Sequence, residues 1–236
     1  MPAFFHYLGC ATFAPMKIDT VIFDMDGLLI DSEPCWEKAG AATLARYGVT
    51  LTKEQYYSTT GLRSKEWIDW WFTYFHLDRG LRDEAEIFLT NTAIDLIRSE
   101  AEPMPGTEHI FSFFSDLNFN IGLATSSPTA LINVVAEKLE FKGKLHGAVS
   151  AENLINGKPH PEVYLDCATV LNVSPLQCIC FEDSVYGMVA AKAARMKCVA
   201  IPAVSQRTDK RFGLADLTLN SLQEFSPAHL ELLMNR

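Results

Sequence analysis

The chain has 236 residues, of which 48% are hydrophobic and 21% charged, and its formal net charge is −9. These proportions are typical of a folded globular protein and exclude a disordered chain. The acidic balance, with no cluster of lysine or arginine, excludes a nucleic-acid partner, because phosphate backbones recruit clustered cations. No apolar run approaches the ~20 residues that cross a bilayer, which excludes a membrane-spanning protein.

Residues 1–17 are predicted to form an N-terminal extension. The first sixteen residues (MPAFFHYLGCATFAPM) are apolar but lack the basic stretch that opens a secretory signal. Met16 comes just before the first strand-like segment. We interpret the stretch as a loose extension, or as the result of a translation start placed too early.

The cysteines show neither the density of a disulfide scaffold nor the paired spacing of a zinc site. Two of them alternate along one strand-like segment and would share a face of the sheet. We expect reduced cysteines packed in the core, and therefore a cytoplasmic protein. The six residues are Cys10, Cys35, Cys167, Cys178, Cys180 and Cys198.

Short apolar runs that alternate with helical patterns predict a doubly wound, parallel α/β sheet of the Rossmann-like type. The strand-like runs cover residues 18–23, 120–124, 146–150, 177–181, 198–201 and 217–219. The helical patterns cover residues 128–139, 161–171 and 184–194. Such a sheet binds ligands at the carboxyl ends of its strands, near the point where the strand order reverses.

Residues 33–102 break this alternation with helical periodicity and no strand. We predict a helical cap domain there, inserted into a core domain of residues 18–32 and 103–236. Pro103, Pro105 and Gly106 mark the return to the core. One helical face is predicted to carry an aromatic set, either as bundle core or for substrate stacking. Its members are Trp67, Trp70, Trp71, Tyr74 and Phe75.

Two acidic residues follow the first strand-like run, within the sequence FDMDG. Asp24 and Asp26 point the same way if the chain stays extended, and Gly27 allows a sharp turn after them. At about 5 to 7 Å the two carboxylates would repel, so one would hold a proton that the other has lost. The ionised aspartate can attack an electrophile, while its protonated neighbour serves the leaving oxygen and then activates water. An Asp-x-Asp pair alone is a weak signal, because loops favour aspartate.

A second acidic group, Glu182 and Asp183, ends a later strand-like run just before Ser184. Carboxylate oxygens suit Mg²⁺, which usually takes one or two carboxylates and keeps several waters. Helix capping could explain Ser184 and Asp183, but it does not explain Glu182. A parallel sheet would bring both acidic groups together, so we expect one Mg²⁺ site between them.

Two further segments suit a phosphate. Thr125, Ser126 and Ser127 offer hydroxyls and backbone N–H groups before a helix that opens with Pro128, and helix starts of this kind attract anions. Ordinary capping by Ser127 is the competing explanation. Lys158 lies between a glycine and two prolines in the segment GKPHP. A loop lysine normally faces solvent, but one held near a phosphate and two aspartates would neutralise the substrate's charge.

Taken in order, these four motifs resemble those of the haloacid dehalogenase superfamily. The helical insert after the first motif is similar to the cap of the β-phosphoglucomutase-like branch, and the resemblance covers residues 18–236. The matching runs are FDMDGLLIDSEP with Trp36, GLR at 61–63, KPHPEVYLDCA at 158–168 and EDSVYGMVAAKAARM at 182–196. Within this branch the sequence looks most like bacterial hexitol phosphatases that also accept 2-deoxyglucose 6-phosphate.

The resemblance implies a Mg²⁺-dependent phosphatase of small phosphorylated metabolites, such as sugar or hexitol phosphates. It implies that Asp24 is phosphorylated, and that Asp26 acts as acid and then as base while its backbone carbonyl binds the metal. Asp183 would be the second metal carboxylate, with Glu182 nearby or bound through water. The phosphoryl group would be held by Thr125, the amide of Ser126 and Lys158.

Two departures separate the chain from the sugar-phosphate mutases of that branch. Trp36 stands where those enzymes carry a histidine, and Pro128 stands where they carry a lysine. The mutase site holds a second phosphate, so the loss of cationic partners favours hydrolysis. A mutase is kept as the alternative.

Three further alternatives have less support in the sequence. Haloalkanoate dehalogenases lack the second aspartate of the first motif, since a halide leaves without a proton, so Asp26 argues against them. Phosphonate hydrolysis needs a desolvated lysine in the cap, and Lys38, Lys53 and Lys65 have polar surroundings. A catalytically idle member that binds a metabolite or a protein is the last alternative, and no missing site residue supports it.

Substrate choice is expected to lie with the cap and the loop leading into it, because the core residues touch only the transferred group. The candidates are Glu33, Trp36, Gly61 and Arg63. Arg63 could bind a substrate hydroxyl or lie on the exposed cap surface, and Glu33 could be a first-turn helix charge. Closure of the cap would exclude water until the leaving group departs. We expect a monomer, although the sequence leaves the oligomeric state open.

Overall fold

The computed structural model describes residues 17–141 and 143–235. The expectation for residues 1–16, including Cys10, lies outside this range. Six parallel strands form one sheet in the order β3-β2-β1-β4-β5-β6. They are β1 (Thr20–Phe23), β2 (Asn120–Thr125), β3 (Gly147–Ser150), β4 (Cys178–Glu182), β5 (Lys197–Ala200) and β6 (Leu217–Thr218). The predicted doubly wound α/β fold is confirmed.

The strand order reverses between β1 and β4. From β1 the chain builds β2 and β3 on one side, and it then crosses to build β4, β5 and β6 on the other. The two central strands run in register, with Phe23 opposite Phe181. Asp24 and Glu182 therefore come at neighbouring strand ends, where such sheets bind their ligands.

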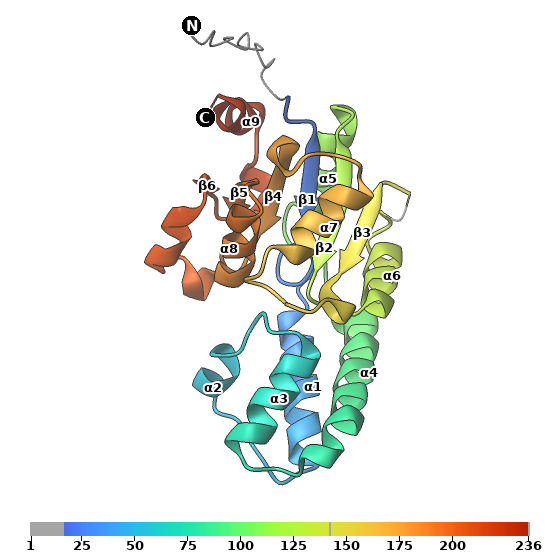
Figure 1. Ribbon diagram of the computed structural model, residues 1–236. Helices are drawn as coiled ribbons and strands as arrows, with labels where there is room; N and C mark the ends of the chain where they lie inside the picture. Colours follow the sequence, from blue (N-terminus) through green and yellow to red (C-terminus); the bar gives the residue numbers. More distant parts are fainter. Residues whose placement is uncertain (1–16, 142, 236) are drawn as a thin grey trace, which may run out of the picture.

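Helices cover both faces of the sheet because its strands are apolar on both faces. Val21 and Phe23 face α5 (Thr107–Asp116), α6 (Thr129–Lys138) and α9 (Pro227–Met234), whereas Ile22 faces α7 (Glu162–Val170) and α8 (Val185–Ala193). Figure 1 shows α7 and α8 in front of the sheet. Cys178 and Cys180 both pack on the α7 and α8 side, as predicted. The described cysteines Cys35, Cys167, Cys178, Cys180 and Cys198 are free and buried.

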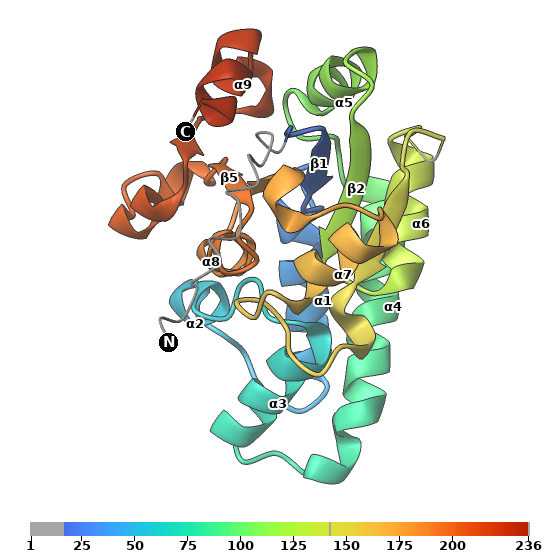
Figure 2. The same cartoon turned by 45° about the horizontal axis from the view of Figure 1, so that its top comes forward.

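The segment after β1 folds into helices beyond the carboxyl edge of the sheet, and Figures 1 and 2 agree on this arrangement. These helices are α1 (Glu33–Ala45), α2 (Lys53–Tyr57), α3 (Ser64–Tyr74) and α4 (Arg82–Glu100). They share a core of their own, with Trp67, Trp71 and Phe72 packed against Leu89. Helices α1 to α4 fall within the expected cap, whose status as a separate domain stays a prediction.

Short 3₁₀ turns lie elsewhere along the chain as well as between α3 and α4. They are Arg79–Leu81, Ala151–Asn153, Pro175–Gln177, Val204–Gln206, Lys210–Leu214 and Leu222–Glu224.

The aromatic residues of α3 do not all share a buried face, and this part of the sequence interpretation is wrong. Trp67 and Trp71 are buried, but Trp70 and Tyr74 are 56% and 58% exposed. Successive residues of a helix turn by about 100°, so the aromatic set spans an arc wider than the face that packs on the bundle. Phe75 stacks on Trp71 at 5.8 Å between ring centres.

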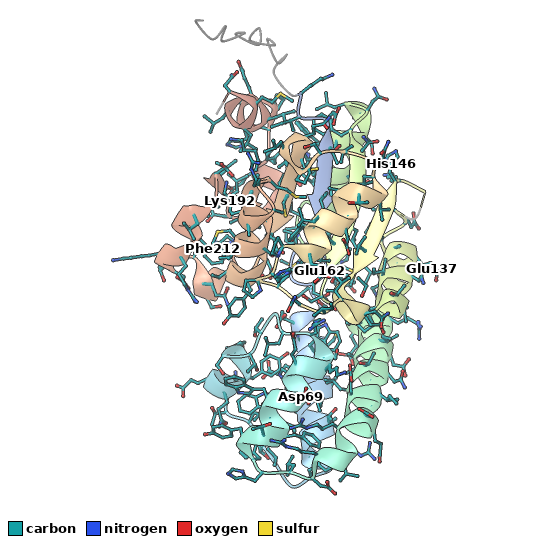
Figure 3. The ribbon with its side chains drawn as sticks, in the orientation of Figure 1. Asp69, Glu137, His146, Glu162, Lys192 and Phe212 are labelled. Atoms are coloured by element: carbon teal, nitrogen blue, oxygen red, sulfur yellow. The ribbon has the colours of Figure 1, made fainter. Side chains whose placement is uncertain are left out.

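One ion pair joins two helices of the cap region to each other. Asp69 pairs with Arg82 at 2.8 Å within the helical part. Figure 3 shows Asp69 among these helices, whereas Glu162 and Lys192 lie on the elements that flank the sheet. None of the described helices is both long and apolar enough to span a bilayer.

Candidate active site

A cavity lies where the carboxyl ends of β1, β2 and β4 meet α1, α3 and the loop before α3. Its wall combines residues of the sheet with residues of the helical part. Most residues singled out from the sequence line it. They are Asp24, Asp26, Glu33, Trp36, Gly61, Thr125, Ser126, Lys158 and Asp183.

Asp24, the first residue after β1, is tied to a buried lysine. Nζ of Lys158 lies 2.5 Å from Oδ1 of Asp24 and 2.6 Å from Oε1 of Glu182, and it donates to the carbonyl of Ala124 at 3.3 Å. Asp24 and Lys158 are each 6% exposed, and Glu182 is fully buried. A buried charge needs partners, and here one ammonium group serves two carboxylates.

The pKa values of the buried carboxyl groups are raised, which indicates an excess of negative charge in the site. Burial raises the pKa of Asp24 to about 8, Glu182 and Asp26 add to the rise, and Lys158 opposes it. Burial and the charge of Asp24 raise the pKa of Asp183 well above its ordinary value. Burial alone would lower the pKa of Lys158, but Asp24 and Glu182 outweigh it and the pKa is raised. One lysine does not neutralise this group of acids.

Three of these acids could hold a metal ion. Asp24, Glu182 and Asp183 each offer a carboxylate oxygen, and the three atoms lie within 4.8 Å of one another. Gly27 has a φ of +72°, and a Cβ at this position would lie 2.3 Å from Oδ2 of Asp183. Only glycine lets the chain turn so close to that carboxylate. An all-oxygen donor set with excess negative charge fits a hard divalent cation.

The carboxylate of Asp26 points away from this acidic group and accepts four hydrogen bonds. Ser32 Oγ donates to Oδ1 at 2.7 Å, and Trp36 Nε1 donates to the same oxygen at 3.0 Å. Ser127 Oγ and Thr125 Oγ1 donate to Oδ2 at 2.7 and 3.3 Å. The first residues of the helical part and the segment after β2 thus fix Asp26 between them.

Sequence reasoning missed the contacts of Ser32 and Ser127. Capping by Ser127 is wrong as an explanation, because α6 has Pro128 as its N-cap and the Ser127 hydroxyl bonds to Asp26 instead. The sequence did contain a signal, because a hydroxyl in the expected anion-binding segment can either cap a helix or bond to another side chain.

Two further serines differ in their contacts. Ser126 has a buried Oγ with no hydrogen-bond partner, at the cavity wall. Ser184 does cap α8, where its Oγ accepts from the Gly187 amide at 3.0 Å.

Tyr164 is a second residue that the sequence did not single out. It lies on the buried face of α7, and its hydroxyl donates to Oε1 of Glu182, the oxygen that also binds Lys158. Nζ of Lys158 lies 5.1 Å from the centre of the tyrosine ring. A tyrosine on an apolar helix face needs a partner for its hydroxyl, and this need was the available signal.

Arg63 lies outside the cavity wall, unlike the other cap candidates. Its guanidinium donates to the carbonyls of Ala151 and Leu154 at 3.1 and 2.6 Å, and it pairs with Glu66 at 2.6 Å. The side chain therefore neither lines the cavity nor lies on an exposed surface, and its role toward a substrate stays a prediction. It joins the start of α3 to the loop after β3.

The lysines weighed for phosphonate chemistry also lie elsewhere. Lys38, Lys53 and Lys65 are exposed, and Lys38 pairs with Glu100. Of the described residues that line the cavity, Lys158 is the only one with a cationic side chain. This geometry gives no support to a Schiff-base lysine.

A doubly wound sheet with acidic residues at its two central strand ends, a buried lysine between them and a helical insert defines a class of hydrolases. The chain belongs to the haloacid dehalogenase-like hydrolase family, whose model matches residues 18–195. The expected family and fold are thus confirmed.

Several known proteins are similar over most of the chain. Hexitol phosphatase B of Escherichia coli K12 is 38% identical, over 92% of this chain and 98% of that protein. A phosphorylated carbohydrates phosphatase of Thermotoga maritima is 29% identical, over 75% and 82%. The solved β-phosphoglucomutase of Clostridium difficile superposes with a TM-score of 0.82 at 25% identity, over 93% and 98%. Together with the family, the phosphatases confirm the predicted enzyme class, a phosphoric monoester hydrolase.

Proposed function

We propose that the protein is a Mg²⁺-dependent phosphatase of sugar or hexitol phosphates that works through an aspartyl-phosphate at Asp24. The observation that carries the proposal is the position of Lys158, bonded to Asp24 and Glu182 beside a three-carboxylate group. The names of the relatives support the substrate class, since they act on hexitol phosphates and phosphorylated carbohydrates.

In the first step, a carboxylate oxygen of Asp24 attacks phosphorus, and the bond between phosphorus and the sugar oxygen breaks. Asp26 donates its proton to that oxygen, so the sugar leaves as a neutral alcohol. Lys158 orients Asp24 and balances charge on the phosphoryl oxygens. The segment of Thr125 and Ser126 lies beside Asp26 and offers hydrogen-bond donors to the same oxygens.

In the second step, Asp26 removes a proton from a water molecule that attacks the phosphorus of the aspartyl-phosphate. The acyl-phosphate bond breaks, Asp24 returns as a carboxylate, and inorganic phosphate leaves. When bound by Asp24 and Asp183, Mg²⁺ supplies positive charge that offsets the clustered carboxylates and the phosphoryl oxygens. The four hydrogen bonds to Asp26 hold its carboxylate in one orientation through both steps.

A mutase of the β-phosphoglucomutase type is the second candidate, because that fold superposes well. A mutase must hold a second phosphate, yet Lys158 is the only cationic side chain among the described lining residues, and two carboxylates already engage it. Phosphorus NMR of a hexose 1-phosphate reaction separates the two. Isomerisation without free phosphate would contradict the phosphatase.

Phosphate release from a panel of sugar and hexitol phosphates, with Mg²⁺ and then with EDTA, tests the proposal. We expect the wild-type enzyme to release phosphate in the presence of Mg²⁺ but not in EDTA. The variant Asp24→Asn should release none, because asparagine keeps the side-chain shape but is not a nucleophile. Wild-type turnover by Asp24→Asn would refute the mechanism. No release from any member of the panel would favour an idle binding protein.

A further inference from the structure

Glu33 is a carboxylate at the cavity wall that pairs with no cation among the described residues. It opens α1 and lines the cavity together with Asp24 and Asp26. No hydrogen bond or ion pair joins its side chain to any other described residue. Burial raises its pKa to about 7, and the negative charges of Asp26, Asp31 and Glu37 add to the rise.

Apart from Lys158, the described residues that line the cavity with Glu33 carry no positive charge. Thr60 and Ser64 line the same cavity with hydroxyls, and Oγ1 of Thr60 is buried without a hydrogen-bond partner. Trp36 and Trp67 supply aromatic surface. The cationic lining residue, Lys158, belongs to the catalytic end and is bound to Asp24 and Glu182.

The phosphoryl group must lie at the catalytic end, within reach of Asp24, so the rest of the substrate extends toward the helical part. A neutral sugar or polyol meets Glu33 and Thr60 there with hydroxyls that can donate to a carboxylate. A second phosphate or a carboxylate would meet the charge of Glu33 in a partly desolvated cavity. Like charges in such a position repel one another, and no free cation among the described lining residues offsets the repulsion.

We propose that Glu33 is a specificity-determining residue that restricts the enzyme to substrates whose leaving group is uncharged. This inference rests on the proposed phosphatase function and narrows its substrate class to phosphorylated neutral sugars and polyols. Discrimination comes from repelling the wrong substrate as well as from binding the right one.

A matched pair of substrates tests the inference. Glucitol 6-phosphate and 6-phosphogluconate have the same carbon chain and differ at one end, where a CH₂OH group replaces a carboxylate. With Mg²⁺ at pH 8, where Glu33 is ionised, wild-type kcat/KM should favour glucitol 6-phosphate by about tenfold or more. Glu33→Gln keeps the shape and hydrogen-bonding capacity, so it should reduce this ratio about tenfold, mainly through faster hydrolysis of 6-phosphogluconate.

Glu37→Gln is the matched control, because Glu37 lies one turn along α1 and does not line the cavity. Its ratio should equal that of the wild type. Equal wild-type kcat/KM values for the two substrates would overturn the inference and leave the phosphatase standing, as would an unchanged ratio in Glu33→Gln. Release of phosphate from neither substrate, nor from any other sugar phosphate, would overturn the proposed function and the inference together.

Discussion

The indole N–H of Trp36 differs from the other three donors to Asp26. The hydroxyls of Ser32, Thr125 and Ser127 can reverse and accept, but an indole nitrogen can only donate. Oδ1, to which Trp36 donates, must therefore stay an acceptor. We infer that the catalytic proton sits on Oδ2, beside Thr125 and Ser127.

Replacing Trp36 with Phe tests this arrangement, since the ring stays and the N–H is lost. We expect kcat to fall about ten- to a hundredfold with a smaller change in KM, because a hydrogen bond to a charged group contributes about 1.5 to 3 kcal/mol. Steady-state kinetics on a hexitol phosphate measures both constants. Trp70→Phe is the control, since Trp70 is exposed on α3. An unchanged kcat in Trp36→Phe would show that Asp26 does not need this donor.

Among the elements, the contact between α3 and the loop after β3 joins the helical part to the sheet. Arg63 donates to three carbonyls of that loop, and the loop continues to Gly157 and Lys158. A Cβ on Gly157 would lie 2.8 Å from Nε of Arg63 and 3.1 Å from Oε2 of Glu66. The close packing thus couples the start of α3 to the position of the lysine.

Gly157→Ala should loosen this contact without removing any charged group. Arg63 and Glu66 would have to shift, so we expect a several-fold rise in KM and a lower kcat, measured on one hexitol phosphate. Gly213→Ala serves as the control, because a Cβ there meets no atom within 4 Å. Identical kinetics for Gly157→Ala and the wild type would mean that the contact has no part in turnover.

The helices and strands could largely be predicted from the sequence. Apolar runs bounded by acidic residues and glycine predicted the strands to within a few residues, and the parallel topology then brought Asp24 and Asp183 together. The contact of Arg63 with the loop after β3 could not be predicted, since it forms only once the helical part packs on the sheet. For Ser127 and Tyr164 the sequence shows hydroxyls that need a partner, but it does not show which carboxylate each one reaches. The exposure of Trp70 likewise depends on which face of α3 the other helices cover.

At the scale of the whole molecule, the crowded carboxylates affect stability. Folding keeps a proton on Asp24 up to about pH 8, whereas the unfolded carboxyl loses it near 3.8. Between these values the folded state binds more protons, so the metal-free fold loses stability as the pH rises. The contribution is complete below pH 3.8 and is lost by about pH 8. Asp183 and Glu33, whose pKa values are also raised, act in the same direction.

The Tm of the metal-free protein should therefore fall between pH 5 and pH 8, and Asp24→Asn should reduce the fall. Mg²⁺ should raise Tm at pH 8 far more than at pH 5, because the ligands must be ionised to bind it. At a hundred times its Kd, Mg²⁺ adds about 2.7 kcal/mol, or about 5 to 10 °C at this chain length. Thermal melts at both pH values, with and without Mg²⁺, measure the shift in Tm. An unchanged Tm at pH 8 on addition of Mg²⁺ would argue against a metal site.

Covalent phosphorylation of Asp24 is most directly tested by trapping the phosphorylated enzyme. Asp26→Ala mixed with p-nitrophenyl phosphate and Mg²⁺ should accumulate it, because nitrophenolate leaves without a proton while no base remains to activate water. After acid quenching, mass spectrometry should find one phosphoryl group on Asp24 that hydroxylamine removes, and Asp24→Asn should show none. A phosphoryl group on another residue, or turnover by Asp26→Ala with Asp24 never modified, would contradict this mechanism.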